Sequence, residues 1–156
     1  MTRKRIAVLT GAGVSAESGL STYRDNGGLW DNYDPMEVAS AEGWAHNPGL
    51  VLDFYNMQRE HLRSVQPNEA HRLIAQLEER FTVDVITQNV DNLHEKAGSH
   101  NVLHLHGELT KARPVNNEYK IIDIGYRKME YDEKDSEGEI LRPHIVWFGE
   151  AVPEIT

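Results

Sequence analysis

The sequence predicts an α/β protein built around a parallel sheet, and three observations support this class. The apolar run at 6–9 is continuous rather than alternating, as in a strand that is buried on both faces. A glycine-rich loop, Gly11-Ala12-Gly13, follows it directly. Two more strand-like runs then alternate with helix-like stretches, which is the rhythm of a parallel sheet with helices on both faces.

The glycine loop has two interpretations. A strand that ends in Gly11-Ala12-Gly13 and turns into a helix presents backbone N–H groups to an anion, the usual way in which a dinucleotide pyrophosphate is held. The same glycines can serve only to make a tight turn. The fingerprint of dinucleotide-binding folds also expects an acidic residue about twenty positions further on, at the end of a strand. That distance falls in 25–34, where no strand is predicted, so an ordinary dehydrogenase site fits badly.

Composition excludes several classes of protein. With 156 residues, of which 39% are hydrophobic, the chain is long enough for one domain with a core. Its net charge of −9 argues against a nucleic-acid surface; an acidic surface suits a lysine-bearing partner or simply keeps a protein soluble. No apolar stretch is long enough to span a bilayer. Residues 1–6 leave no room for a signal peptide, so we expect a cytoplasmic protein without membrane partners.

Start signals mark three helices. The pairs Asp34-Pro35 and Asn47-Pro48 each combine an N-cap residue with proline at the first helical position. Apolar residues recur at helical spacing over 50–62, which predicts one buried face. A third helix is predicted over 68–79. Its expected core residues are Leu73, Ile74 and Leu77.

Two further strands are predicted at 83–87 and 102–105, with a short helix at 93–96 between them. Another strand is predicted at 119–124, and the charged stretch at 132–139 is expected to be a solvated loop. The loops after the first three strands should converge, because open α/β sheets bind ligands at the carboxyl ends of their strands. These loops are 11–15, 88–91 and 106–107.

Four segments, in this order along the chain, resemble motifs of the sirtuin (Sir2) family of NAD-dependent protein deacylases. One such match could be chance, but four in order across nearly the whole chain are hard to explain otherwise. The segments are Gly11-Ala12-Gly13-Val14-Ser15-Ala16-Glu17-Ser18-Gly19 with Tyr23-Arg24 and Gly28-Leu29-Trp30; Thr87-Gln88-Asn89-Val90-Asp91-Asn92-Leu93-His94; Leu105-His106-Gly107-Glu108-Leu109; and Arg142-Pro143-His144-Ile145-Val146-Trp147-Phe148-Gly149-Glu150.

The resemblance implies a Rossmann-like domain that binds NAD and consumes it as a co-substrate. Asn89 and Asp91 would line the pocket for the nicotinamide carboxamide, and Gln88 would orient the nicotinamide ribose. Sirtuins usually carry Phe where this chain has Tyr23. The full set of cofactor-binding residues implied is Gly11, Ala12, Gly13, Ser15, Glu17, Tyr23, Arg24, Trp30, Gln88, Asn89, Val90 and Asp91.

His106 stands between a strand and a glycine, and a histidine is the side chain best able to take up a proton near neutral pH. Taken alone, it could equally be a turn histidine with one backbone hydrogen bond. The resemblance implies that His106 is the general base, with Asn89 and Gln88 as the other catalytic residues. After the acyl-lysine oxygen has displaced nicotinamide, His106 would activate the ribose 2′-hydroxyl through the 3′-hydroxyl, and O-acyl-ADP-ribose would leave.

The resemblance also implies an acyl-lysine protein or peptide as substrate. Segment 146–150 would pair with it as an added strand, although it could also be an ordinary core strand. Sirtuins that prefer succinyl- or malonyl-lysine carry a Tyr-x-x-Arg pair. Here Gln58 takes the place of the arginine and Arg59 comes one position later, so we expect a weaker preference for acidic acyl groups. The substrate-binding residues implied are Tyr55, Gln58, Val146, Trp147, Phe148 and Gly149.

No zinc is expected. Most sirtuins resemble one another in a structural zinc held by four cysteines, and the chain contains none. The pair His104 and His106 could hint at a different metal site together with His94. No Asp or Glu lies in the same short strand to complete that site, so no metal ligand is predicted.

The predicted division of the chain has three segments. Residues 1–110 form the first part of the Rossmann-like NAD-binding domain with a helical insertion. A small zinc-less module follows at 111–141, and 142–156 holds a return strand and the substrate segment. Because sirtuins continue past this point, we expect an incomplete fold whose uncovered sheet edge permits self-association. Two other functions stay open, namely ADP-ribosyl transfer and a non-catalytic module that binds ADP-ribose or a protein.

Overall fold

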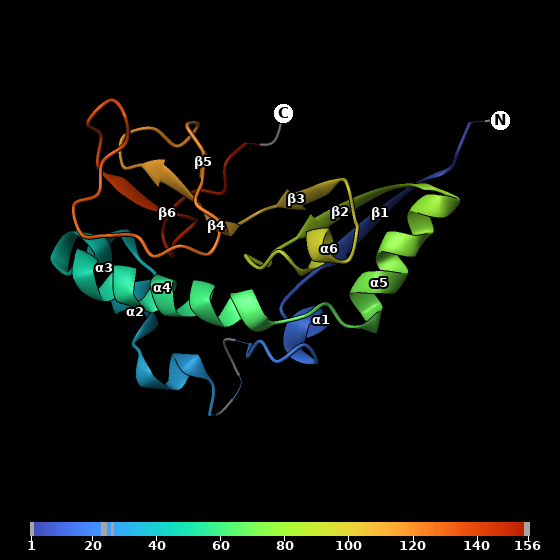
Figure 1. Ribbon diagram of the computed structural model, residues 1–156, viewed down its shortest axis with the longest axis horizontal. Coiled ribbons are helices and arrows are strands. Elements are labelled where there is room, and N and C mark those ends of the chain that lie inside the picture. The colour runs from blue at the N-terminus through green and yellow to red at the C-terminus, as the bar shows by residue number, and fades with distance from the viewer. Residues whose placement is uncertain (1, 23–24, 26, 155–156) are drawn as a thin grey trace.

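The computed structural model describes residues 2–22, 25 and 27–154. Figure 1 shows two sheets with helices below and beside them. The helices are α1 (Gly13–Ala16), α2 (Pro35–Val38), α3 (Ala41–His46), α4 (Pro48–Ser64), α5 (Glu69–Gln76) and α6 (Leu93–Lys96), with 3-10 turns η1 (Leu29–Asn32) and η2 (Leu77–Glu79). The strands are β1 (Arg5–Thr10), β2 (Thr82–Thr87), β3 (Val102–His104), β4 (Gly107–Pro114), β5 (Ile122–Asp123) and β6 (Leu141–Ile145).

The first sheet is parallel and has the order β1-β2-β3 (Figure 1). Helix α6 packs on it through His94, whose Nε2 lies 2.9 Å from Thr10 Oγ1 at the end of β1. Helix α5 packs on α6, since the rings of His71 and His94 meet edge to face at 5.0 Å. The predicted α/β class with a parallel sheet is confirmed.

The burial expected for the first strand is wrong. Residues of β1 alternate between partly buried and exposed, and Leu9 is 69% exposed. Ile6 and Val8 pair in register with the buried Val83 and Val85 of β2, and Thr10 on the same side of β1 contacts His94, so the covered face is the one on which α6 packs. A continuous apolar run in a sequence does not show whether one face or both faces of the strand are covered. Among the described residues, only one face of β1 is covered.

The second sheet is antiparallel, with the order β5-β4-β6, and lies beside the first in Figure 1. Its strands come from all three predicted segments. Strand β4 lies partly in segment 1–110 and partly in segment 111–141, and most of β6 lies in segment 142–156. Gly107 makes this pairing possible. Its φ is 85°, and a Cβ placed there would lie 2.0 Å from the carbonyl oxygen of His144 on β6. Only glycine fits such a close approach.

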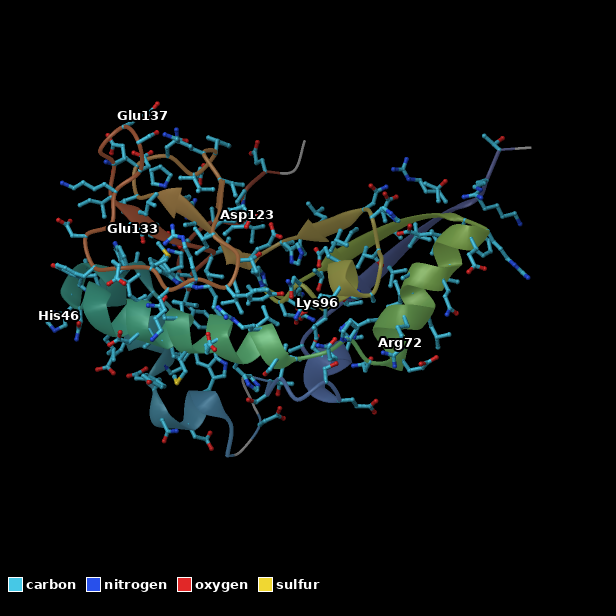
Figure 2. The ribbon with its side chains drawn as sticks, in the orientation of Figure 1. His46, Arg72, Lys96, Asp123, Glu133 and Glu137 are labelled. Atoms are coloured by element: carbon cyan, nitrogen blue, oxygen red, sulfur yellow. The ribbon has the colours of Figure 1, made fainter. Side chains whose placement is uncertain are left out.

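Charged side chains hold the loops around this second sheet, on which Figure 2 shows Glu133 and Glu137. Lys120 Nζ lies 2.6 Å from both Asp135 and Glu137. Asp135 also accepts hydrogen bonds from the backbone N–H groups of Glu137 and Glu139, each at 2.9 Å, and its side chain is 2% exposed. The expectation of a plain solvated loop at 132–139 is therefore wrong for Asp135.

The predicted helix starts are confirmed. Asp34 accepts a hydrogen bond from the Met36 N–H at the start of α2, and Asn47 accepts one from the Leu50 N–H at the start of α4. Both caps satisfy a backbone donor that a helix end leaves without a partner. Such signals are local, so they can be read without knowledge of the tertiary fold.

The core residues predicted for α5 are wrong. In α5 the buried residue is His71, whereas Leu73 is 52% exposed, and Ile74 and Leu77 are only half-buried. His71 is held inward by its hydrogen bonds to Ser15 and to the Asn68 N–H at the start of the helix, whereas the other polar residues of α5 are exposed.

The strand expected at 119–124 is reduced to β5, Ile122–Asp123. Tyr119 is 82% exposed and Ile121 is 50% exposed, so most of this apolar stretch does not pack against the sheet. None of the helices within the described ranges is both long enough and apolar enough to cross a membrane.

Candidate active site

The loops that follow β1, β2 and β3 converge on one cavity of about 890 Å³. This is the arrangement predicted from the order of the strands. Most of the predicted site residues line the cavity, from both the cofactor set and the substrate set. Those residues are Ala12, Gly13, Ser15, Trp30, Tyr55, Gln58, Gln88, Asn89, Val90, Asp91, His106, Val146, Trp147, Phe148 and Gly149.

Two predicted cofactor residues within the described ranges, Gly11 and Glu17, are not among the lining residues. Gly11 contributes its carbonyl oxygen, which accepts a hydrogen bond from Asn89 Nδ2 at 3.0 Å. Glu17 is exposed at the C-terminal end of α1 and is not among the residues that line the cavity, so its contact with the cofactor stays a prediction. Tyr23 and Arg24 lie outside the described residues.

Gly13 shows why the loop carries glycine. Neither Gly11 nor Gly13 has a positive φ, and a Cβ at Gly13 would meet no atom of the described residues within 4 Å, apart from its own helix backbone and its chain neighbours. The need for a tight turn therefore does not explain this residue. Gly13 lines the cavity, and the missing side chain leaves room for a ligand to approach the backbone of the loop closely.

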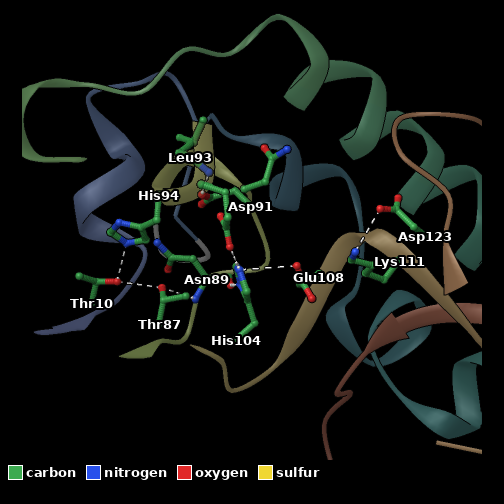
Figure 3. A network of polar contacts seen from close by, with 12 residues as sticks. Thr10, Thr87, Asn89, Asp91, Leu93, His94, His104, Glu108, Lys111 and Asp123 are labelled. Atoms are coloured by element: carbon green, nitrogen blue, oxygen red, sulfur yellow. Dashed lines mark hydrogen bonds and ion pairs between the residues drawn. The ribbon is translucent and has the colours of Figure 1, made fainter. Parts of the chain in front are cut away.

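Three polar side chains are locked together on the floor of the cavity. Ser15 Oγ donates to Asp91 Oδ2 at 2.9 Å and accepts from Asn89 Nδ2 at 3.3 Å. Asp91 Oδ1 accepts the N–H of Leu93 at 3.0 Å (Figure 3). All three polar residues are buried, so their hydrogen bonds fix the direction of each group before any ligand arrives.

Two fully buried histidines lie behind this floor, and their role there was not predicted. The backbone N–H of Asn68 donates to His71 Nδ1, so the Nε2–H of His71 faces Ser15 Oγ at 3.2 Å. Burial lowers the pKa of both His71 and His94, and their mutual repulsion adds to the effect on His71. These two rings are therefore neutral supports of the floor. The contacts join segments more than fifty residues apart, so no short motif could reveal them.

The hydrogen bonding of His106 prepares it to accept a proton. Its Nδ1 lies 3.1 Å from the carbonyl oxygen of Gln88, and a carbonyl can only accept, so Nδ1 carries the hydrogen. The lone pair of a neutral ring is then on Nε2. Because His106 lines the cavity, it can serve there as a general base.

The segment after β6 differs from the predicted extended strand. The strand ends at Ile145, and residues 147–150 form a turn in which the Glu150 N–H donates to the Trp147 carbonyl oxygen at 3.0 Å. Gly149, with φ of 84°, permits the turn. The Phe148 N–H donates to the Ala39 carbonyl oxygen, which ties the turn to the start of α3. The turn forms because the Glu150 side chain folds back onto the Trp147 N–H at 2.8 Å.

An ion pair between the buried Arg142 and the partly buried Glu150 supports this turn. Arg142 donates to both carboxylate oxygens of Glu150, at 2.8 and 2.9 Å, and lies 3.6 Å from the centre of the Trp147 ring. Trp147 Nε1 donates to Tyr55 Oη at 3.0 Å. The Arg142 contact and this hydrogen bond therefore fix the position of the Trp147 ring.

His144 on β6 is also affected by its surroundings. Burial and the charges of Arg113 and Arg142 lower the pKa of His144 to about 4.

Helix α4 contributes Tyr55 and Gln58 to the cavity, as predicted. Nε2 of Gln58 is buried and has no hydrogen-bond partner among the residues that the structure describes. Burial raises the pKa of Tyr55. Arg59 points elsewhere, because its guanidinium donates to the carbonyl oxygens of Leu109 and Arg127, each at 3.2 Å. Burial, with repulsion from Arg127, lowers the pKa of Arg59 to about 10.

One group of metal-type donor atoms occurs within the described part of the chain. Donors of Glu95, His104 and Glu108 lie within 4.8 Å of one another. The carboxylates come from α6 and β4, whereas the sequence argument looked for them only in the strand of His104. The grouping of His104 with His106 and His94, which the sequence argues against, is not among the groups of metal-type donors in the described residues. His104 is hydrogen-bonded to Glu95 and to Asn89, so we assign no metal to the group.

Several residues that line the cavity were not predicted. Leu109, Ile145 and Glu150 lie within the motif segments but were given no role, and the others carry no motif of their own. These residues are Leu20, Ser21, Thr22, Ala39, Leu109, Ile145, Glu150 and Val152.

The parallel sheet, the glycine loop and the cavity at the carboxyl edge define an α/β protein of the Rossmann-like class. The model of the Sir2 family matches residues 11–156. The chain therefore belongs to the Sir2 family.

Relatives and solved structures agree with this assignment. The chain is 55% identical over 157 aligned positions to an NAD-dependent protein deacylase of Bacteroides thetaiotaomicron, covering 97% of this chain and 67% of that protein. It is 50% identical to one of Helicobacter pylori strain J99, covering 96% and 64%. The chain thus spans about two thirds of the length of the curated relatives that it matches.

Two solved complexes of Sir2 homologues share the fold. A variant bound to ADP-ribose is 42% identical with a TM-score of 0.86, covering 97% of this chain and 61% of that one. A complex with NAD is also 42% identical, with a TM-score of 0.83, covering 97% and 60%.

Proposed function

We propose that this protein is an NAD-dependent protein-lysine deacylase that releases nicotinamide and O-acyl-ADP-ribose. The observation that carries the proposal is the convergence of His106, with Nε2 free, and the Ser15–Asn89–Asp91 floor on one cavity. A proton acceptor beside fixed polar groups is what a reaction at a ribose requires. The names of the relatives support the same function.

The residues present fit NAD. Gly13 leaves open space beside its backbone, which suits the approach of a pyrophosphate. Asn89 and Asp91 offer amide and carboxylate groups of fixed direction, which suit the nicotinamide carboxamide. When bound, NAD would supply an electrophilic ribose carbon and a leaving nicotinamide.

The side chains of this chain then have separate tasks. Asn89 and Asp91 orient the nicotinamide end, and the apolar walls from Leu109 and Ile145 exclude water from it. The acyl-lysine enters beside Trp147. His106 accepts the proton of a ribose hydroxyl at Nε2 while Nδ1 stays bonded to the Gln88 carbonyl oxygen.

The first test uses Gly13→Ala. Alanine should not lower the melting temperature, because Gly13 begins α1 and alanine is favoured over glycine in a helix by about 0.5–1 kcal/mol. The affinity for NAD should nevertheless fall about tenfold or more, since the new methyl group fills the space that we assign to the cofactor. Calorimetric titration with NAD and a thermal melt measure the two effects.

Gly49→Ala is the matched control for this substitution. Gly49 lies in the first turn of α4, away from the cavity, and its added Cβ would meet only Asn47 Oδ1 at 3.7 Å. Its affinity for NAD should equal that of the wild type. Unchanged affinity for NAD in Gly13→Ala would refute the placement of the cofactor beside Gly13.

The acyl group is the subject of the second test. Gln58 offers to the cavity a neutral amide whose Nε2 has no partner among the described residues, and Arg59 cannot reach the cavity without breaking its hydrogen bonds to Leu109 and Arg127. We propose that acetyl-lysine is therefore processed as well as succinyl-lysine or better. Gln58→Arg should raise the ratio of kcat/KM for succinyl over acetyl peptides about tenfold, because charged hydrogen bonds are stronger.

Arg59→Ala provides the opposite comparison. It should lower stability without changing the ratio between the two acyl groups, because Arg59 holds backbone carbonyls rather than the cavity wall. A strong succinyl preference in the wild type that Arg59→Ala abolishes would show that Arg59, not Gln58, meets the acyl group.

A further inference from the structure

His104 occupies a junction between the catalytic loop and two acidic side chains. It is the last residue of β3, and its side chain is 5% exposed. Nδ1 lies 2.8 Å from the carbonyl oxygen of Asn89, and Nε2 lies 2.5 Å from Glu95 Oε1. Figure 3 shows the ring between Asn89 and Glu108. The proposed function assigns no role to His104.

Both ring nitrogens of His104 face groups that accept hydrogen bonds. A backbone carbonyl cannot donate, and an ionised carboxylate cannot donate either. The ring therefore satisfies both contacts only as an imidazolium, with a hydrogen on each nitrogen. Burial alone lowers the pKa of His104, but the hydrogen bond and charge of Glu95 outweigh it, so the pKa is raised.

The other charged groups around His104 are consistent with this state. Glu108 Oε1 on β4 lies 3.7 Å from Nε2 and adds a second negative charge. His94 on α6 and His144 on β6 both have pKa values lowered first by burial, and the charge of His104 adds to the effect in each case. Those two rings are therefore neutral, and His104 holds the positive charge of the group.

Asn89 is held by its backbone as well as by its side chain. Its N–H donates to Thr87 Oγ1 at 3.0 Å, and its carbonyl oxygen accepts from His104. Its Nδ2 then points at Gly11 and Ser15 on the floor of the cavity. We propose that His104, oriented by Glu95, is a positioning residue that fixes the backbone of Asn89 and thereby sets the affinity of the cavity for NAD.

This inference rests on the proposed function, because it takes NAD as the ligand of the cavity. A surface ion pair would be the simpler explanation, and the chain contains one for comparison. His100 Nδ1 lies 2.6 Å from Glu78 Oε2, but His100 is 85% exposed in its side chain and reaches no residue of the cavity. The pair of Glu95 and His104 differs because its second ring nitrogen holds the backbone of a residue that lines the cavity.

The test compares Glu95→Ala with Glu95→Gln in the whole protein. Alanine removes the group that orients the ring, so KM for NAD should rise about tenfold. Glutamine can donate from its amide to a neutral Nε2 while Nδ1–H stays on the Asn89 carbonyl, so it should restore KM to within about threefold of the wild type. KM for the acyl peptide should stay constant in both, because the segment at 146–149 lies on other elements.

A double-mutant cycle with His104→Leu adds a second readout. If Glu95 acts through His104, the two substitutions together should raise KM for NAD no more than His104→Leu alone. The matched control is Glu78→Ala, which removes the carboxylate from His100 and should leave KM for NAD unchanged. A thermal melt of each variant separates loss of affinity from loss of fold.

Binding and NMR measurements keep this proposal separate from the proposed function. Calorimetry with NAD and a ring-nitrogen titration of His104 need no turnover, so they decide the proposal even if no deacylation is detected. We expect an imidazolium at pH 7 in the wild type and a neutral ring in Glu95→Ala. A neutral ring in the wild type, or unchanged NAD affinity in Glu95→Ala, overturns the proposal. Saturable Zn²⁺ binding that Glu95→Ala and Glu108→Ala abolish would also overturn it, because Nε2 would then hold a metal.

Discussion

Replacing His106 by alanine is expected to reduce deacylation about a hundredfold to ten-thousandfold, the contribution typical of a general base. NAD binding should change little, because the floor of the cavity is built by Ser15, Asn89 and Asp91 and does not depend on the ring of His106. The measurement is nicotinamide release from NAD with an acetyl-lysine peptide, together with calorimetric titration of NAD.

His100→Ala is the control for this variant, since His100 is an exposed histidine at the far end of β3 and lies outside the cavity. It should retain full activity. Near-normal turnover in His106→Ala would refute the role of His106 as the base. Nicotinamide release by the wild type that is independent of the acyl peptide would instead favour ADP-ribosyl transfer or hydrolysis of NAD.

Replacing Glu150 by alanine is expected to lower the free energy of unfolding by about 3–5 kcal/mol. The substitution leaves Arg142 buried without its carboxylate, and the Trp147 N–H loses its acceptor. Removal of one partner from a buried ion pair is costly because the remaining charge stays desolvated. Urea denaturation followed by tryptophan fluorescence measures the change.

Glu133→Ala tests whether burial is the reason. Glu133 pairs with Arg127 at 2.7 Å, but the Arg127 side chain is 47% exposed. Loss of this pair should change the free energy of unfolding by less than about 1 kcal/mol. If Glu150→Ala and Glu133→Ala are equally mild, the ion pair of Arg142 does not stabilise the turn at Trp147.

Local signals in the sequence predict the helix starts and the position of the site. The caps at Asp34 and Asn47 form as expected, because a capping side chain needs only residues two or three positions away. The site followed from the strand order, since loops at the carboxyl ends of parallel strands must meet. The side of α4 that carries Tyr55 and Gln58 was likewise predictable from helical spacing.

Features that depend on distant contacts were not predictable. Leu73 reads as a core residue, but His71 takes the inner face of α5 because Ser15, more than fifty residues earlier, offers it a buried partner. The turn after β6 replaces the expected strand because Glu150 folds back onto Trp147 and Arg142. Sequence patterns describe apolar periodicity, and they contain no information on which buried polar groups find one another.

The contact of Gly107 with β6 has a consequence for how this protein can be varied. Gly107 directly follows His106, which we propose as the base, and the Val146 N–H donates to the His106 carbonyl oxygen at 2.9 Å. The backbones of His106 and Val146 are therefore held together by a hydrogen bond, and neither can shift without the other. Laboratory evolution toward new acyl groups should find few tolerated changes at this junction, whereas the helix that carries Gln58 can change one wall of the cavity independently.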